Sequence, residues 1–284
     1  MSEFREALDA TISHLESLKR AGVTHVPVHR ETLEALSRPV AAPPASLPTT
    51  SPSSITMPKP VTEPTDIFAE RIRPAGSTKT EKLASLREQA LACVKCKHLA
   101  ASRTQVVFGV GNPESELMFV GEAPGADEDA KGEPFVGRAG QLLTKIIETM
   151  GFKRSDIYIG NILKCRPNMP EGESGNRQPT DPEMQTCLPW LHAQIDIIQP
   201  KVLVTLGAVA LRGLLPELSG GISKLRGRWL LYRNIPMMPT YHPAFVLRQY
   251  TMQNRRLIWE DMLAVLERLG HPITPKMQNY FKSE

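Results

Sequence analysis

The four cysteines are the residues of this sequence whose type and spacing most clearly suit chemistry. Cys93 and Cys96 form a C-x2-C pair, whereas Cys165 and Cys187 stand apart, with 21 residues between them. Zinc ribbons and zinc fingers generally use a second close pair, which this chain lacks. Four thiolates with no surplus cysteine suit a site with four cysteine ligands, and both zinc and an iron–sulfur cluster accept such a set. The spacing leaves these two open, against the alternative of four unrelated buried thiols.

A second set of reactive side chains follows short apolar runs of the chain. Glu122, Asn161 and His242 each come just after such a run, and each run reads as a β-strand. In open α/β sheets, ligands bind beyond the carboxyl ends of the strands. We therefore expect a carboxylate, an amide and an imidazole to meet at one edge of a sheet, although each of them alone is more typical of a turn or loop.

The glycine loop that contains Glu122 does not have the form of a nucleotide-binding loop. Residues 121–125 read GEAPG and lack both G-x-G-x-x-G and Gly-Lys-Ser/Thr, which argues against dinucleotide and P-loop binding. The acidic residues Asp127, Glu128 and Asp129 follow the loop, and their charge would repel phosphate. The alternative for this acidic patch, and for Asp129 above all, is a solvated turn.

Basic residues gather where acidic ones are absent. The window Leu218–Trp259 holds no Asp or Glu over 42 residues and contains Trp229, Tyr232, Tyr241 and Tyr250. Basic side chains with interleaved aromatic rings are typical of a contact with a nucleic-acid backbone, whereas a solvated face usually mixes both signs of charge. We therefore predict a phosphate-contacting surface here. Its basic residues are Lys224, Arg226, Arg228, Arg233, Arg248, Arg255 and Arg256.

Alternating strands and helices between about residues 78 and 270 must position these groups. Short apolar runs predict the strands, and apolar residues at helical spacing predict the helices. Thr180 or Asp181 caps a helix that runs to about Ile198. This alternation predicts the α/β class, with a three-layer α/β/α arrangement around a four-stranded, mainly parallel sheet. The expected strands are 117–120, 157–160, 202–206 and 235–240, and the expected helices are 81–92, 137–150, 181–198, 255–269 and one after Gly207.

Composition sets the class of protein and its compartment. The chain has 284 residues, of which 41% are hydrophobic and 23% are charged, and its formal net charge is +4. These values support a packed core and exclude collagen-like, coiled-coil and wholly disordered chains. No run of about 18 apolar residues predicts a membrane span, and the first residues lack the apolar region of a secretory signal. We therefore expect a cytoplasmic location, where thiols stay reduced.

Several segments in a fixed order carry a resemblance to a known family. They read C-V-K-C, GEAPGADEDAKGEPFVGRAGQLL, NILKCRP, LGAVAL, ISKLRGRW and PTYHPAFVLR. With these segments, residues 93–265 resemble the family 4 uracil-DNA glycosylases, the iron–sulfur branch of that superfamily. The resemblance implies the same α/β/α fold and the removal of uracil from DNA, which leaves an abasic site for base excision repair. It also implies a [4Fe–4S] cluster on Cys93, Cys96, Cys165 and Cys187.

The resemblance also implies roles for individual side chains. Phe135 falls where the family stacks a ring on uracil, Asn161 where an amide reads the base edge, and His242 where an imidazole meets uracil O2. Gly121, Glu122 and Ala123 fall in the motif that faces the sugar and the base. The segment 243–248 falls where the family has a loop that wedges the duplex. We expect Glu122, or else Glu128 or Asp127, to position water, and we expect Lys224, Arg226 and Arg248 to contact DNA.

The chain outside the resemblance divides into three predicted parts around the glycosylase domain, residues 78–270. Residues 1–38 predict a helical extension, because apolar residues recur at helical spacing from Phe4 to Leu18. Its apolar stripe predicts docking within the protein or helix–helix association, with a repair or replication partner as the alternative. Residues 39–77 predict a Pro/Ser/Thr-rich linker. Residues 271–284 predict a tail, in which a frayed end is favoured over a docking peptide at 278–281.

One departure from the family and two competing functions remain. The segment 168–180 is longer than the family's usual link, and a related branch carries a histidine there that crosslinks to DNA. His192, already on the next helix, is the only histidine nearby, so we expect turnover. The alternatives are a non-catalytic iron–sulfur module that binds DNA or acts as a scaffold, and a glycosylase for another deaminated base.

Overall fold

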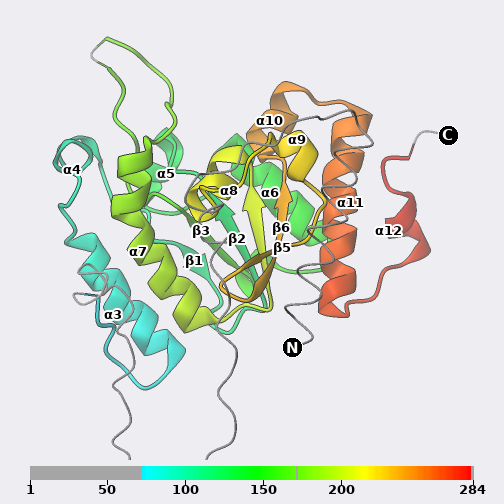
Figure 1. Cartoon of the computed structure of the whole chain (residues 1–284), viewed down its shortest axis with the longest axis horizontal. Helices are drawn as coiled ribbons and strands as arrows, with labels where there is room; N and C mark the ends of the chain where they lie inside the picture. Colours follow the sequence, from blue (N-terminus) through cyan, green and yellow to red (C-terminus); the bar gives the residue numbers. More distant parts are fainter. Residues whose placement is uncertain (1–71, 171, 283–284) are drawn as a thin grey trace, which may run out of the picture. The chain divides into compact units, whose positions relative to one another are not determined.

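The computed structural model describes residues 72–170 and 172–282, which form an α/β fold (Figure 1). The predicted extension 1–38 and nearly all of the linker 39–77 lie outside the described residues. No helix within the described ranges is long and apolar enough to cross a membrane. The helices are α3 (Lys79–Leu91), α4 (Lys97–Ser102), α5 (Ala126–Lys131), α6 (Arg138–Thr149), α7 (Asp181–Ile198), α8 (Ala208–Leu214), α9 (Ile222–Leu225), α10 (Pro243–Arg248), α11 (Met252–Leu269) and α12 (Pro275–Asn279). The strands are β1 (Val110–Gly111), β2 (Leu117–Gly121), β3 (Tyr158–Asn161), β4 (Val202–Leu206), β5 (Leu230–Tyr232) and β6 (Ile235–Thr240).

The sheet has six strands in the order β1-β3-β2-β4-β6-β5. The four central strands are parallel and are the ones that the sequence predicts, so the α/β class and the mainly parallel sheet are confirmed. The predicted number of strands was wrong, because β1 and β5 add antiparallel edges. These two strands have only 2 and 3 residues, too few for an alternating pattern to stand out in the sequence.

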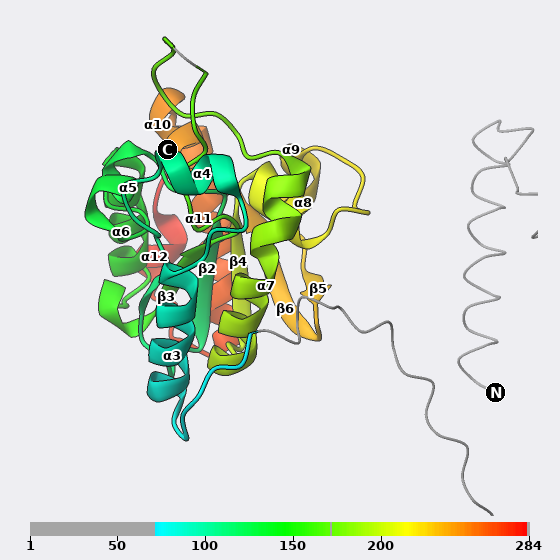
Figure 2. The same ribbon diagram turned by 90° about the vertical axis from the view of Figure 1, so that its left-hand side faces the viewer.

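Helices cover both faces of the sheet, because successive side chains of each strand point to opposite faces. In β2, Met118 and Val120 pack with α3, α7 and α8, whereas Leu117 and Phe119 pack with α6 and α11. Figure 2 shows α7 and α8 to the right of the central strands and α6 to their left. All five residues of β2 are buried, as expected for a strand covered on both faces.

The C-terminal segment packs on α11, so the prediction of a frayed tail was wrong. The Trp259 indole Nε1 donates a hydrogen bond to the Met277 carbonyl at 2.6 Å. Arg256 Nη1 donates to the carbonyls of Gln278 and Tyr280, each at 2.9 Å. The Arg255 guanidinium lies 4.2 Å from the centre of the Phe281 ring, within the range of a cation–π contact.

Candidate active site

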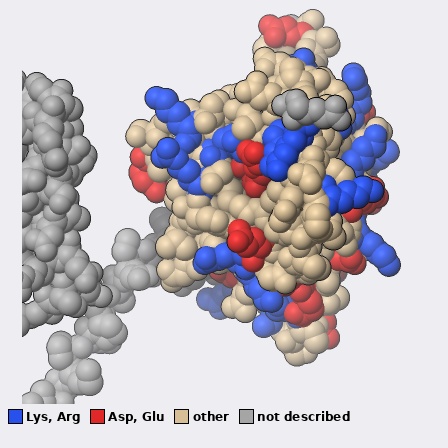
Figure 3. All heavy atoms as spheres, turned by 90° about the vertical axis from the view of Figure 1, so that its right-hand side faces the viewer, with Lys and Arg blue, Asp and Glu red and all other residues tan. Residues whose placement is uncertain are grey.

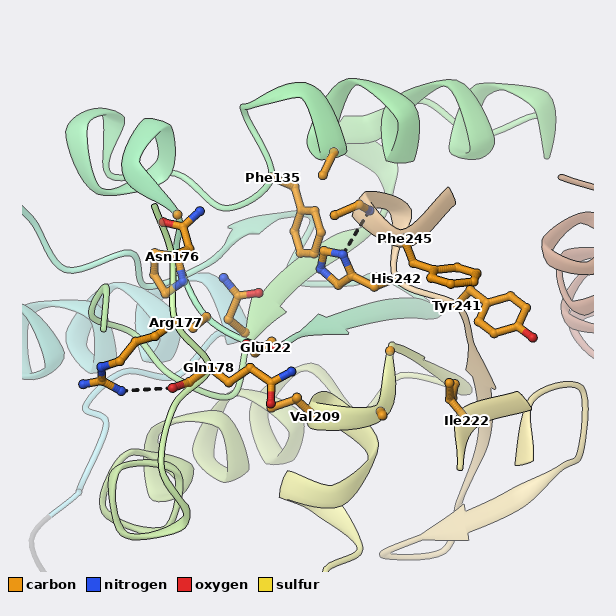
Figure 4. Close-up of a pocket in the computed structure, with 18 of the residues that line it drawn as sticks. Glu122, Phe135, Asn176, Arg177, Gln178, Val209, Ile222, Tyr241, His242 and Phe245 are labelled. Atoms are coloured by element: carbon orange, nitrogen blue, oxygen red, sulfur yellow. Dashed lines mark hydrogen bonds between the residues drawn. The ribbon is translucent and has the colours of Figure 1, made fainter. Parts of the chain in front are cut away.

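A cavity of about 500 Å³ lies at the carboxyl ends of the parallel strands. Gly121, the last residue of β2, pairs in register with Asn161, the last residue of β3. Strand β6 ends two residues before His242. Glu122, Asn161 and His242 all line the cavity, so the predicted meeting of a carboxylate, an amide and an imidazole does occur. Figure 4 shows Glu122 and His242 in the cavity and the close approach of Phe135 to His242.

The absence of a side chain at Gly121 leaves room for the inner end of the cavity. A Cβ atom at this position would lie 2.3 Å from Asn161 Oδ1 and 2.6 Å from the Phe135 ring. The same observation shows that the amide and the ring meet over Gly121. Asn161 is 2% exposed, and its Oδ1 has no hydrogen-bond partner among the residues that the structure describes. Leaving a buried acceptor unpaired costs free energy, so this oxygen is available to a donor on a ligand.

Phe135 is held in an unusual backbone conformation at the cavity wall. Its φ is +55°, in the left-handed region that costs a bulky residue free energy. Helix α6 approaches so closely that a Cβ at Gly140 would lie 1.8 Å from the Phe135 carbonyl oxygen. The Phe135 ring lies 5.7 Å from the His242 ring at an angle of 31°. The backbone conformation thus holds Phe135 in the cavity wall, next to His242.

Glu128 holds the loop before α6 by binding backbone amides. Its Oε1 accepts hydrogen bonds from Val136 N and Gly137 N, each at 2.9 Å, and its Oε2 accepts one from Gly125 N at 3.1 Å. With these three hydrogen bonds, the Glu128 carboxylate fixes the backbone that follows Phe135. This arrangement argues against Glu128 as the group that positions water, although the residue does line the cavity.

The geometry around His242 defines which of its nitrogens carries the proton. The backbone N–H of Ala244 donates to Nδ1 at 3.1 Å, so in the neutral ring the proton is on Nε2. Burial, together with the charge of Arg248, lowers the pKa of His242 to about 4. At neutral pH the side chain is therefore an uncharged donor through Nε2–H. His242 also caps α10, which shows that segment 243–248 is a helix and not the expected loop.

Glu122 is the carboxylate of the cavity with a strongly shifted pKa. Burial raises its pKa to about 7, and the charge of Arg212 opposes this only in part. Its backbone carbonyl accepts a hydrogen bond from Leu163 N at 3.0 Å, which joins the loop after β2 to the turn after β3. A carboxylate that titrates near neutral pH is suited to accept a proton from water.

Asp129 is not part of a solvated turn, so the alternative interpretation of this residue was wrong. The residue is 4% exposed. Its carboxylate accepts hydrogen bonds from Thr104 N at 3.0 Å and from Gln105 N at 3.4 Å. These bonds tie α5 to the segment that follows α4. Asp129 therefore has a structural role behind the loop that carries Glu122.

The segment 168–180 contributes a wall that the sequence analysis missed. Asn176, Arg177 and Gln178 line the cavity and lie opposite Phe135 and His242 in Figure 4. Arg177 anchors this wall through two hydrogen bonds to the Glu183 carboxylate, at 2.7 and 2.9 Å. The Arg177 guanidinium also lowers the pKa of Glu183 to about 2. The capping box of α7, formed by Thr180 and Glu183, was the available signal that this loop is fixed at its end.

The three basic residues expected to contact DNA have different surroundings. Arg248 is exposed and lines the cavity, and Lys224 is exposed on α9, which contributes Ile222 and Ser223 to the cavity wall. The Arg226 side chain is only 12% exposed and forms an ion pair with Asp261. This inward placement argues against Arg226 as a phosphate contact.

The acid-free window of the sequence does not make an acid-free surface. Figure 3 views the molecule from the side of α11 and α12 and shows basic side chains in several groups with acidic ones between them. Of the three basic residues expected to contact DNA, Arg248 lines the cavity and Lys224 is exposed next to Ser223, which lines it.

The four cysteines gather between three segments of the fold. Cys93 follows α3, Cys96 caps α4, Cys165 follows β3, and Cys187 is part of α7. Burial raises the pKa of the Cys96 thiol, and the neighbouring Cys165 and Cys93 sulfurs raise it further. Two of the sulfurs also face N–H donors: Arg103 Nη1 lies 3.1 Å from Cys165 Sγ, and Lys164 N lies 3.2 Å from Cys187 Sγ.

Comparison with known proteins places this fold and cavity in a family. The family model of the Uracil DNA glycosylase superfamily matches residues 108–263. This chain belongs to the uracil-DNA glycosylase superfamily. The matched range includes Glu122, Phe135, Asn161 and His242.

Curated relatives extend the match toward the N-terminus. The chain is 41% identical over 204 residues to a type-4 uracil-DNA glycosylase of Sulfurisphaera tokodaii, covering 69% of this chain and 87% of the relative. It is 42% identical over 188 residues to the type-4 enzyme of Thermotoga maritima, covering 65% and 93%. A type-5 uracil-DNA glycosylase of Thermus thermophilus is 27% identical over 210 residues, covering 62% and 91%. The resemblance to family 4 is confirmed.

Proposed function

We propose that this protein excises uracil from DNA by hydrolysing the N-glycosidic bond, and that its cysteines hold a [4Fe–4S] cluster. The observation that carries the proposal is the cavity in which an aromatic ring, an unpaired amide oxygen and an Nε2–H imidazole face the same space. The activity named in the type-4 relatives supports it. The resulting abasic site is the starting point for base excision repair.

Base recognition follows from the groups around Gly121. The target base lies inside the DNA stack, so the nucleotide must be flipped out at a cost of a few kcal/mol. Stacking on Phe135 offsets part of this cost. Uracil presents a donor at N3 beside an acceptor at O4, which the Asn161 amide matches through Oδ1 and Nδ2. Cytosine presents the reverse pattern, and the unpaired groups would then be buried.

Bond cleavage places negative charge on the departing uracil and positive charge on the sugar. A neutral His242 can donate its Nε2–H to uracil O2 and stabilise the developing anion, as preorganised donors do at other oxyanions. Glu122 faces the same cavity and, when ionised, can orient a water molecule and stabilise the sugar cation. Asn161 and His242 come from the ends of different strands, so the sheet itself maintains the spacing between the two donors.

The cysteine site fits an iron–sulfur cluster by its donor set. Four sulfurs gather, and N–H groups point to two of them, as is common for thiolate ligands of such clusters. Among the described residues, no three His, Cys, Asp or Glu side chains surround one ion position. A cubane cluster does not require such a group, because each thiolate binds a different iron atom. The bound cluster would crosslink α3, the turn after β3 and α7, and hydrolysis needs no electron from it.

Iron analysis tests the cluster separately from activity. We expect the purified protein to be brown and to contain about four irons per chain. Replacing Cys165 or Cys187 by alanine should bleach the protein and lower its stability, because metal binding contributes to folding. Stoichiometric zinc without iron in freshly isolated protein would refute the cluster. A cytoplasmic location, which keeps thiols reduced, remains part of this proposal.

A base-release assay tests the activity. The iron-containing full chain is incubated with single- and double-stranded oligonucleotides that carry uracil, hypoxanthine or xanthine, and the free base is identified by mass spectrometry. Release of uracil with an abasic site left in the DNA is the expected result. DNA binding without release of any base would indicate a non-catalytic module instead, and preferred release of hypoxanthine or xanthine would assign a different substrate.

A further inference from the structure

Lys164 is a fully buried lysine between the proposed base reader Asn161 and the proposed cluster ligand Cys165. It is 1% exposed and is among the largest fully buried side chains of the described chain. Among the described residues, no carboxylate lies within ion-pair distance of its Nζ. Burying an ammonium group without a paired carboxylate costs free energy. The hydrogen bonds of the ammonium group must therefore offset the cost of burying it.

The Lys164 ammonium group binds the residue that faces the base. Its Nζ donates a hydrogen bond to the backbone carbonyl of Asn161 at 2.9 Å. A second bond goes to Gln194 Oε1 at 2.5 Å. Gln194 is held in turn, because its Nε2 donates to Phe108 O at 2.9 Å and to Tyr158 OH at 3.0 Å. The ammonium therefore has a defined position beneath the last residue of β3.

The backbone of Lys164 contacts both the cysteine site and a neighbouring segment. Its N–H lies 3.2 Å from Cys187 Sγ, and its carbonyl accepts a hydrogen bond from Val107 N at 2.8 Å. The preceding turn is attached to the loop after β2 by Ile162 N and Leu163 N, which donate to the Gly121 and Glu122 carbonyls. One residue thus connects the end of β3 with α7 and with the sulfur of Cys187.

We propose that Lys164 is a positioning residue that sets the orientation of the Asn161 amide for uracil. This inference rests on the proposed function. An amide that reads a base must be prevented from turning over, and Asn161 Oδ1 has no partner in the described structure to do so. The Lys164 hydrogen bond restrains the Asn161 peptide, and the contact with Cys187 Sγ links that restraint to the cysteine site.

A double-mutant cycle between Lys164 and Asn161 tests the proposal. Lys164→Met keeps most of the side-chain volume and removes the donor. We expect it to lower the single-turnover rate of uracil excision at least about tenfold in the wild-type background. In the Asn161→Ala background the same substitution should lower the rate by less than about threefold, because the effects of substitutions at interacting residues are not additive. Lys201→Met, at an exposed lysine with a side chain 69% exposed, is the matched control and should leave the rate unchanged.

Binding provides a readout that a loss of stability alone would not move. The iron-loaded variants are titrated with DNA that carries a non-cleavable, 2′-fluorinated deoxyuridine, and with the same DNA carrying thymine. Lys164→Met should lose most of the preference for the uracil-containing DNA. Equal losses in both Asn161 backgrounds, or an unchanged preference, would overturn the proposal. Uracil release by the wild-type protein, measured in parallel, shows whether the proposed function itself holds.

A second variant keeps the test open if Lys164→Met does not fold or does not hold iron. Gln194→Leu leaves the charge and the contact with Cys187 but removes the acceptor that orients the ammonium group. It should reproduce the loss of preference for uracil, and again more strongly when Asn161 is present. Additive effects of Gln194→Leu and Asn161→Ala would contradict the positioning role.

Discussion

Two buried polar regions near the carboxyl edge of the sheet differ in whether their hydrogen bonds are complete. In the first, Arg226 Nε donates to Asp261 Oδ2 at 3.0 Å, and Thr240 Oγ1 donates to the same oxygen at 2.5 Å. Arg226 Nη2 also binds the Leu257 carbonyl and Asp261 Oδ1. In the second, the cavity, Asn161 Oδ1 has no partner among the described residues.

This difference separates residues that maintain the fold from residues that are available to bind a ligand. A completed buried network is rigid, and removing one member leaves the others unpaired. An incomplete one is tolerated only where something else supplies the missing partner. Burial shifts pKa values in both regions: it raises that of Asp261 to about 6 and that of Glu122 to about 7, and with the charge of Arg248 it lowers that of His242 to about 4.

The largest expected effect comes from breaking the complete network. Asp261→Ala leaves the Arg226 guanidinium buried without its counter-charge, which typically costs about 3–5 kcal/mol. Denaturant unfolding should show this loss, while the excision rate per folded molecule stays close to that of the wild type. A variant of normal stability would mean that Arg226 turns out to solvent, and its candidacy as a DNA contact would then be restored.

At the cavity we expect the opposite result, a large loss of excision rate with little loss of stability. His242→Ala removes the proposed donor to uracil O2, and loss of such a donor typically lowers the rate about 10²–10³-fold. Stability should change little compared with Asp261→Ala, since His242 makes one side-chain hydrogen bond, to Ala244 N. The check is single-turnover excision at saturating enzyme. A loss below about tenfold would remove His242 from the proposed mechanism.

A smaller and graded effect is expected from pH. If ionised Glu122 orients water, the excision rate should fall by about tenfold for each pH unit below its pKa of about 7. His242 adds no dependence between pH 5 and 8, because its pKa of about 4 keeps it neutral there. Glu122→Gln should abolish this slope and lower the rate. A slope that persists in the variant would assign the ionisation to another group.

The stability of the same variant gives the sign of the Glu122 shift independently. A carboxyl whose pKa is higher in the folded protein costs stability when ionised, so the cost begins above pH 4.5 and is complete above about pH 7. Glu122→Gln should therefore be more stable than the wild type at pH 8 and not at pH 4. Equal stability at both values would show that Glu122 is well solvated.

The sequence predicted those features of the site that depend on strand ends. Glu122, Asn161 and His242 follow buried apolar runs, and parallel strands bring their carboxyl ends to one edge. The four central strands and α7 were visible for the same reason, because hydrophobic period and capping residues are local signals. The cysteine set was visible from residue type and number, although spacing alone could not choose between zinc and iron–sulfur.

The features that the sequence did not reveal depend on side-chain direction in loops. Arg226 looked like a DNA contact because its neighbours in the chain are basic, yet its partner Asp261 lies 35 residues away. Asp129 and Glu128 looked like a solvated acidic patch, yet both carboxylates bind backbone amides. The wall formed by residues 176–178 has no pattern of its own, because its position depends on Arg177 reaching Glu183.

The smallest expected effect concerns Arg248, which differs from Arg226 in being exposed at the cavity. Arg248→Ala should weaken binding to duplexes of any sequence and reduce the salt dependence of log K by about one, if the guanidinium meets one phosphate. Arg233→Ala is the matched control, since Arg233 is exposed and pairs with Asp196 at 3.0 Å. Equal slopes for the Arg248 variant and the wild type would contradict the phosphate contact.

Arg248 has a second expected effect, on His242. Because the Arg248 charge contributes to the low pKa of His242, Arg248→Ala should raise that pKa, and NMR titration of the imidazole would detect the change without any DNA. A phosphate contact alone would leave the free protein's titration unchanged, so the two measurements separate the part that Arg248 plays in DNA binding from the part it plays in keeping His242 neutral.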